Sequence, residues 1–333
     1  MTPSARPDIA AVLDLMQGRT IRHVFLVACG GSLSIMHAGK YLLDRLSPSL
    51  ASDLYNADEF VTRDPRILGP ESLVILCSQT GTTKETVRAA AHARSKGALV
   101  VAMSLDLESP LARAADAAVQ YQASYTTGVA IDAADSNYAV LYRLLVGLVR
   151  IVDGVDLVSR LEQSLAGLQP VIDRAQTLYR ERFDAFAPRF QASPAVYTLA
   201  GGPVFGAAYS FSICVLMEMQ RYNSQAIHAN EFFHGPFEVV DEKACFIAML
   251  GLDETRPLAE RARDFLLRFG APERILVLDA KELDLSGLDD LFAGYLVPLV
   301  FFDTLWKFAY RLADLRQIPM LEGRRYMKKI SNY

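Results

Sequence analysis

Short apolar runs that end in glycine-rich or hydroxyl-rich turns recur along the first half of the chain. A buried strand and a glycine-rich turn are predicted by "IRHVFLVACGGS", and an amphipathic helix by "LSIMHAGKYLLDRL". The same order of strand, loop and helix returns in "SLVILCSQTGTTKETVRAAAHARSKG", before another strand in "ALVVAMSL". Because connections between parallel strands almost always cross over right-handed, this half is predicted to form a doubly wound α/β sheet.

The second half repeats this order of elements. A second strand, loop and helix are predicted by "AVYTLAGGPVFGAAYSFSICVLMEM", and the later elements have parallels in "ACFIAMLGLDETRPLAERARDFLLRFG" and "ERILVLDA". Charged helical sequence separates the two copies, without a glycine-serine linker. We therefore expect a tandem pair of α/β subdomains, each a doubly wound parallel sheet flanked by helices. Their expected bounds are 1–155 and 191–333, with connecting helices at 156–190.

Hydroxyl side chains fill the loops of the first copy, whereas Thr255 is the only hydroxyl in "GGPVFG" and "GLDETR" of the second. Ligands of open parallel sheets bind beyond the carboxyl ends of the strands, where helix N-termini favour negative charge. Gly30, Gly31 and Gly81 let the backbone approach such a ligand. The first copy therefore predicts a phosphate site, although serine and threonine also cap helices without binding anything. The candidate phosphate ligands are Gly31, Ser32, Ser78, Gln79, Thr80 and Thr83.

One carboxylate interrupts the uncharged run "AAYSFSICVLMEMQ". Glu218 is the only charged residue from Pro203 to Gln220, and apolar residues surround it on nearly every side, so a buried helix is predicted. Burial of an unpaired carboxylate raises its pKa toward neutrality, which suits a general acid or base. The alternative is a structural carboxylate satisfied by a neighbouring helix or on the side of Arg221.

A second candidate for proton transfer is His234, within "NEFFHGPFEVVD". Pro236 biases Gly235 toward extended backbone, so His234 is expected in a loop or at a strand start, not on a helix face. Imidazole titrates near neutral pH, which suits proton transfer. Glu231 is either a second acid or an orienting hydrogen-bond partner. The remaining histidines are expected to be structural: His23, His37, His92 and His228.

Composition and charge exclude several classes of protein. With 51% hydrophobic residues, 22% charged residues and a formal net charge of −4, the chain is globular and lacks the basic excess of nucleic-acid-binding proteins. No apolar run suits a membrane span, and Ala192–Met217 comes nearest. The four cysteines lack metal-binding spacing, and neither loop matches a nucleotide P-loop or GxGxxG. We expect a cytoplasmic protein with no metal, cofactor, nucleic acid or membrane partner.

The motifs "CGGS", "SQTGTTKET" and "EFFHGPFEVVD" resemble those of the SIS (sugar isomerase) family, over nearly all 333 residues. Within that family, "SICVLMEMQ", "HANEFFHGPFEVVD" and "RRYMKKISNY" are most similar to the fructose-asparagine and fructoselysine 6-phosphate deglycases. The resemblance implies that Glu218 and His234 are the acid-base pair and that Ser32, Ser78 and Thr83 hold a sugar phosphate. It also implies a homodimer with shared active sites, in which His234 acts in its own subunit or across the interface.

The reaction implied by this resemblance is cleavage of a 6-phosphofructosyl amino acid to glucose 6-phosphate and the free amino acid. Further candidates for substrate contacts are Asn56, Glu59 and Lys328. Glucosamine-6-phosphate synthase, a more distant relative, carries a lysine where this chain has Val215, which argues against its route. The alternatives are a ketose-aldose phosphosugar isomerase, an aminosugar-phosphate deaminase, or a non-catalytic phosphosugar sensor. The sequence leaves the amino acid of the conjugate open.

Overall fold

Two units, each built around one parallel sheet, make up the computed structural model, which describes residues 6–123, 131–327 and 329–330. The units are Met1–Gln169 and Pro170–Tyr333, and the division falls inside the long helix α8 (Val158–Gln191). The predicted tandem of doubly wound α/β subdomains is confirmed.

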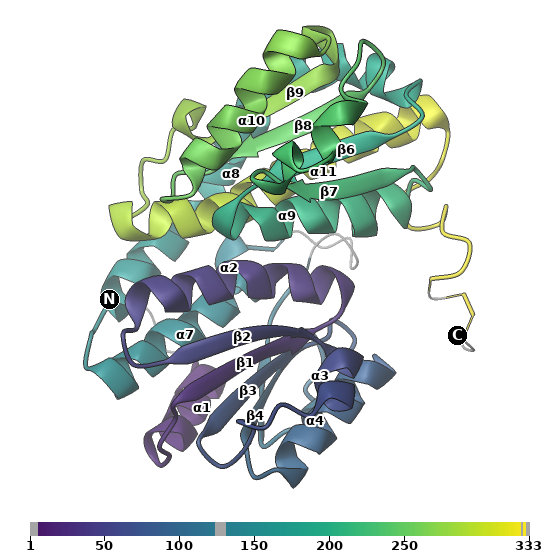
Figure 1. Ribbon diagram of the computed structural model, residues 1–333. Coiled ribbons are helices and arrows are strands. Elements are labelled where there is room, and N and C mark those ends of the chain that lie inside the picture. The colour runs from purple at the N-terminus through teal and green to yellow at the C-terminus, as the bar shows by residue number, and fades with distance from the viewer. Residues whose placement is uncertain (1–5, 124–130, 328, 331–333) are drawn as a thin grey trace. The chain divides into compact units, whose positions relative to one another are not determined.

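The first unit contains five parallel strands in the order β2-β1-β3-β4-β5. Its elements are α1 (Pro7–Gln17), β1 (His23–Ala28), α2 (Gly30–Leu46), β2 (Ala51–Asn56), α3 (Ala57–Arg63), β3 (Ser72–Cys77), α4 (Lys84–Ser95), β4 (Leu99–Ser104), α5 (Pro110–Ala114), β5 (Ala117–Gln120), η1 (Ala133–Asp135) and α7 (Asn137–Asp153). Helices α1, α2 and α7 pack together on one face of the sheet, and α3, α4 and α5 on the other (Figure 1). Strands β1, β3 and β4 are buried at every position, as their continuous apolar runs predict.

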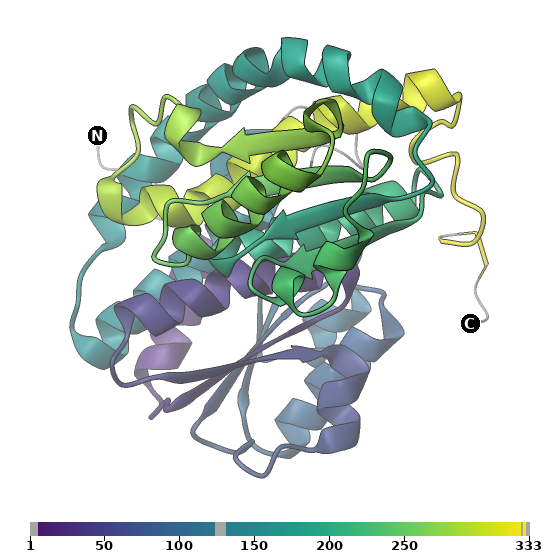
Figure 2. The same cartoon turned by 45° about the horizontal axis from the view of Figure 1, so that its top comes forward.

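The second unit contains four parallel strands in the order β7-β6-β8-β9. Besides the second part of α8, its elements are β6 (Val196–Ala200), η2 (Gly202–Val204), α9 (Phe205–Ser210), η3 (Phe211–Met217), β7 (Ser224–His228), η4 (Glu231–Phe233), η5 (Pro236–Val239), β8 (Cys245–Leu250), α10 (Arg256–Phe269), η6 (Pro272–Arg274), β9 (Ile275–Asp279), η7 (Ala280–Glu282) and α11 (Asp290–Arg316). Figure 2 shows α10 on one face of this sheet and α8 with α11 on the other.

Helix α11 is the core helix of the second unit. Of the described helices, it is the one that passes by length and composition as a membrane span, but 78% of its apolar window is buried inside the protein. This helix therefore comes nearer to a membrane span than Ala192–Met217, which the sequence analysis singled out. Its burial is typical of the central helix of a layered α/β unit.

A buried ion pair fastens the start of α10 to the end of β9. Arg256 is 7% exposed and donates two hydrogen bonds of 2.8 Å to the carboxylate of Asp279, and a third of 2.7 Å to the Gly251 carbonyl. Burial is the largest single influence and raises the pKa of Asp279. The hydrogen bonds from Arg256 and the Lys281 N–H, together with the charges of Arg256 and Arg263, outweigh it, so the pKa lies below its usual value. The ionised carboxylate thus contributes stability that is lost as the pH falls through this lowered pKa.

We predict that Asp279→Ala lowers the free energy of unfolding by about 1.5–3 kcal/mol at pH 7, because it removes two charged hydrogen bonds from the buried Arg256, which keeps only its 2.7 Å bond to the Glu260 carboxylate and its bond to the Gly251 carbonyl. The difference from the wild type should narrow under acidic conditions, where the wild-type carboxylate also becomes protonated. The measurement is urea denaturation across a pH series. The control is Asp184→Ala, which removes the exposed pair between Asp184 and Arg311 and should change stability little. Equal losses for the two variants would contradict the role of the buried pair.

Candidate functional site

The structure brings the two hydroxyl-rich loops of the first unit together. Strands β1 and β3 are neighbours with Ala28 opposite Cys77, so both loops leave the same edge of the sheet. The Ser32 side chain lies near the Cys77 thiol, and burial raises the pKa of that thiol to about 11. The strand order reverses direction at this point, which is where open α/β sheets bind ligands.

Side-chain caps are missing from the helices that follow these loops. The residue before α2 is Cys29, which makes no side-chain cap hydrogen bond, and the same holds for Thr83 before α4. The Thr83 hydroxyl instead lies 2.9 Å from the Ser78 hydroxyl. By contrast, Ser109 caps α5 in the usual way. The side chains of Thr83 and Ser78 therefore do not act as helix caps.

Two glycines shape the backbone of these loops. Gly30 has φ +55° and already forms the first turn of α2, which begins three residues before the predicted "LSIMHAGKYLLDRL" helix. Gly81 has φ +63°, and a Cβ at this position would overlap with the side chain of Ser109. Both positions require glycine, because side-chain-bearing residues rarely adopt this backbone conformation.

The other predicted phosphate ligands make contacts within their own loops. The Gly31 carbonyl accepts a hydrogen bond of 2.6 Å from Ser34, and the Gln79 carbonyl accepts one from the end of β4. The Thr80 hydroxyl lies 2.7 Å from that of Thr82. These contacts make the backbone of both loops well defined, which a preorganised anion site requires.

The corresponding loops of the second unit are filled by the protein's own carboxylate. Gly202 has φ +54°, like Gly30 of the first unit, and a Cβ on it would overlap with the side chains of Asp253 and Thr255. The Asp253 carboxylate accepts a hydrogen bond of 2.9 Å from the Thr255 N–H. A negative charge thus lies where a ligand of the second copy would have to enter, which supports an anion site in the first copy.

Glu218 immediately follows the π-helical segment η3, which continues α9. Its N–H donates to the Ile213 carbonyl, five residues back, at 3.0 Å. Such π-helical turns occur frequently at functional sites. The helix is not buried on all sides as expected, because Ile213 is 38% exposed and Met217 46% exposed. The side chain of Glu218 is 19% exposed.

The Glu218 carboxylate is paired, which corrects the expectation of an unpaired acid. Its Oε1 lies 2.8 Å from Nε of Arg324, whose side chain is 14% exposed. The cation is therefore Arg324 and not Arg221, which is exposed. Arg324 was not among the site residues predicted from the sequence. Its only signal was the segment "RRYMKKISNY", because no local pattern joins residues so far apart.

His234 lies in the turn between η4 and η5 and is exposed, so its predicted loop position is correct. Its N–H donates to the Glu231 carbonyl at 2.9 Å, so the structure links these two residues through the backbone. Gly235 is not extended as expected but has φ +130° and ψ −55°. Without a Cβ, glycine escapes the restriction that proline places on the preceding residue.

The three remaining candidates for substrate contacts lie in different places. Asn56 ends β2, and its Oδ1 is 3.7 Å from Sγ of Cys29, beside the glycine-rich loop. Glu59 is exposed on α3, and its Oε1 lies 3.8 Å from Nη1 of Arg63. Lys328 is outside the described residues. Of these three, only Asn56 is shown next to a predicted phosphate loop.

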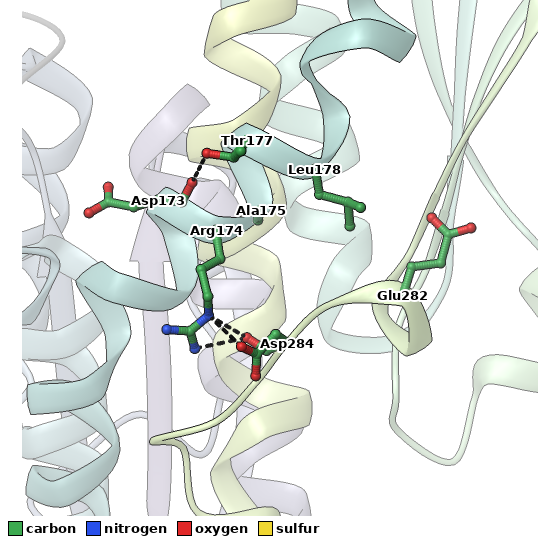
Figure 3. A pocket seen from close by; sticks show the side chains of 7 residues that line it. All are labelled: Asp173, Arg174, Ala175, Thr177, Leu178, Glu282 and Asp284. Carbon is green, nitrogen blue, oxygen red and sulfur yellow. Dashed lines mark hydrogen bonds and ion pairs between the residues drawn. The ribbon is translucent and has the colours of Figure 1, made fainter.

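Two surface hollows of the second unit lie apart from the predicted residues. One has a volume of about 460 Å³ and is lined by α8 and the segment after β9 (Figure 3). Its Arg174 is occupied by Asp284, through an ion pair of 2.9 Å and a hydrogen bond to the carbonyl. The other hollow, of about 550 Å³, lies between α8 and α11.

Within the described residues, no group of three or more His, Cys, Asp or Glu could hold a metal.

The chain is similar to known proteins over nearly its whole length. A family model described as "SIS domain" matches residues 19–147. The chain is 47% identical to fructosamine deglycase FrlB of Bacillus subtilis (strain 168), over 99% of this chain and 98% of that protein. It is 28% identical to fructoselysine 6-phosphate deglycase of Escherichia coli (strain K12), over 87% and 82% of the two chains. A crystal structure from Bacillus subtilis, provisionally described as a phosphosugar isomerase, has a TM-score of 0.93 and 46% identity, over 98% and 97% of the two chains.

The loop geometry predicts that Gly81→Ala destabilises the first unit by about 1–3 kcal/mol, because alanine is strained at this φ and its Cβ overlaps with Ser109. The same variant should bind inorganic phosphate more weakly. Urea denaturation and calorimetric titration measure the two effects. The matched control is Gly69→Ala, since a Cβ there has no neighbour within 4 Å. Unchanged stability and phosphate binding in Gly81→Ala would show that the loop does not depend on this conformation.

Proposed function

The chain belongs to the SIS family, as its motifs indicated, and we propose that it is a deglycase of 6-phosphofructosyl amino acids. The observation that carries this proposal is its 47% identity, over nearly the full length of both chains, to a fructosamine deglycase. The proposed substrate has an amino acid nitrogen on sugar C1, a carbonyl at C2 and a phosphate at C6. Its products are glucose 6-phosphate and the free amino acid.

In this proposal, the loops after β1 and β3 hold the phosphate. Ser32, Ser78 and Thr83 supply hydroxyl donors, and the first turns of α2 and α4 supply backbone N–H groups without side-chain caps. Helix N-termini favour anions through both the N–H groups and the helix dipole. The phosphate takes no part in bond breaking. Its binding energy fixes the position of the sugar, and this lowers the barrier of the chemical step.

Glu218 is the proposed base. The C2 carbonyl makes the C1 hydrogens acidic, and Glu218 removes one of them to give an enaminol. A proton is then returned to C2, which converts the ketoamine into an aldimine of the aldose. One water molecule adds at C1, and the bond between C1 and nitrogen breaks to release the amine. Arg324 lies 2.8 Å from this carboxylate and places an opposite charge beside the proposed base.

His234 is the proposed proton carrier at oxygen. Opening of the sugar ring and the change from carbonyl to hydroxyl at C2 both require protons to move between oxygen atoms. The exposed turn between η4 and η5 presents an imidazole, whose two ring nitrogens can accept and donate protons. In a homodimer, this histidine acts in its own subunit or in the active site of the partner.

We also propose that the protein is a homodimer in the cytoplasm. The helix that ends at Glu218 exposes Ile213 and Met217, and a second copy covering them would remove apolar surface from water. All four cysteines are free thiols, as a reducing compartment permits. Sedimentation velocity tests the dimer, and a single species with the mass of one chain at micromolar concentration would contradict it.

The proposed base predicts that Glu218→Gln lowers kcat by about 10²–10⁴-fold, because glutamine cannot accept the C1 proton. The variant should keep its circular dichroism spectrum. Release of glucose 6-phosphate, followed with a coupled dehydrogenase, measures the effect. Glu108→Gln is the control, since this side chain is exposed on the first unit. Near-normal turnover by Glu218→Gln would mean that another group is the base.

The proposed function predicts equal amounts of glucose 6-phosphate and free amino acid from 6-phosphofructosyl amino acids. A panel of such conjugates is incubated with the purified protein, with fructose 6-phosphate and glucosamine 6-phosphate as comparisons. Conversion of fructose 6-phosphate alone would favour the isomerase, and ammonia release from glucosamine 6-phosphate the deaminase. Binding of these compounds without turnover of any would favour the sensor.

A further inference from the structure

The chain after α11 folds back onto the segment that follows Glu218. The side-chain amide of Gln220 donates to the Ile318 carbonyl at 3.0 Å, and Arg316 donates to the Gln220 carbonyl at 3.0 Å. A Cβ on Gly323 would lie 3.2 Å from the Met219 carbonyl. These contacts hold residues 317–324, which we name the C-terminal segment, against the end of the helix. The last residue of this segment is Arg324.

The guanidinium of Arg324 is only partly used by the protein. Its Nε lies 2.8 Å from the Glu218 carboxylate but is too poorly aligned for a hydrogen bond, although the atom is buried. Among the described residues, Glu218 is the only side chain paired with this guanidinium. The two terminal nitrogens therefore keep a planar edge that matches a carboxylate in a bidentate manner.

The other arginines near the end of this helix are differently placed. Arg316 donates to a backbone carbonyl and lies 4.1 Å from the centre of the Tyr222 ring. Arg221 is exposed and has φ +51°. Of the three, Arg324 is therefore the arginine that is both largely buried and directly beside the proposed base.

We propose that Arg324 binds the α-carboxylate of the amino acid in the substrate. The inference rests on the proposed function and names the part of the substrate that this function leaves open. In an α-linked conjugate, only the nitrogen and Cα separate the reacting C1 from the carboxylate. When the proposed base Glu218 reaches the C1 proton, the carboxylate of the substrate therefore lies close to Glu218. Arg324 lies directly beside Glu218 and can contact that carboxylate. Conjugates through the lysine side chain carry their carboxylate much farther from C1.

In the free protein, the carboxylate next to the Arg324 guanidinium is that of Glu218. When the substrate binds, its own carboxylate takes the terminal nitrogens of Arg324 and shares the positive charge with Glu218. The substrate class that follows is an α-linked 6-phosphofructosyl amino acid with a free carboxylate, in preference to amides, simple amines and conjugates of the lysine side chain.

The experiment compares two substrates of nearly equal size, 6-phosphofructosyl glycine and 6-phosphofructosyl glycinamide. Wild type should prefer the carboxylate by about 10–100-fold in kcat/KM, the usual effect of a charge-assisted hydrogen bond. Arg324→Met should lower kcat for both substrates, because it removes the charge partner of Glu218, and should in addition raise KM for the carboxylate alone, so that the preference is lost. Arg324→Lys should keep part of it. Arg325→Met, at the exposed neighbour, is the control and should leave both substrates unchanged.

Equal kcat/KM values of wild type for the two substrates would overturn the inference. So would an equal loss for both substrates in Arg324→Met, because a purely structural role does not distinguish carboxylate from amide. Calorimetric titration of wild type with both compounds separates this inference from the proposed function. If neither compound is turned over, the deglycase proposal fails, and equal affinities would then also refute the carboxylate site.

Discussion

A carboxylate that is largely removed from water needs a compensating charge, and the pair of Glu218 and Arg324 supplies it. Burial of an isolated ion costs several kcal/mol, whereas a close opposite charge offsets most of that cost. The partner comes from residues beyond α11, which reach the helix end through hydrogen bonds to Gln220. The pair therefore ties the end of the chain to the helix that carries the proposed base.

The two units use the same sheet topology for different tasks. In the first, hydroxyl-rich loops and uncapped helix N-termini face the point where the strand order reverses. In the second, the carboxylate of Asp253 fills the equivalent loops, and the polar residues of interest come from the helix after β6 and the turn after β7. In the proposed function, the first unit binds the phosphate and the second transfers protons. In this proposal, the duplicated fold separates binding from chemistry.

The sequence predicted the elements well because local patterns determine them. Continuous apolar runs identified the buried strands β1, β3 and β8, and the repeated order of strand, loop and helix identified the tandem. The errors occur at glycines. Gly30 begins α2 although it lies in a predicted turn, and Gly235 has a positive φ where extended backbone was expected. Glycine has too weak a backbone preference for its neighbours to fix its conformation.

The sequence singled out candidate residues, whose roles stay predictions, but it did not show how they pair. Glu218 was conspicuous as a single charge in an apolar run, yet its partner lies beyond α11, and no periodicity links the two positions. The same limit applies to Asp253, whose acidity is visible in the sequence although its place against Gly202 is not. Contacts between distant segments depend on how the elements within a unit pack, which the local pattern does not specify.

The central claim is that the carbon-nitrogen bond breaks only after a proton has moved from C1 to C2. The most direct measurement is NMR analysis of the sugar phosphate released from a 6-phosphofructosyl amino acid in D₂O. We expect glucose 6-phosphate with solvent deuterium at C2 and a single substrate-derived hydrogen at C1. Release of fructose 6-phosphate with both C1 hydrogens retained would contradict it, because the bond would then have broken without proton transfer.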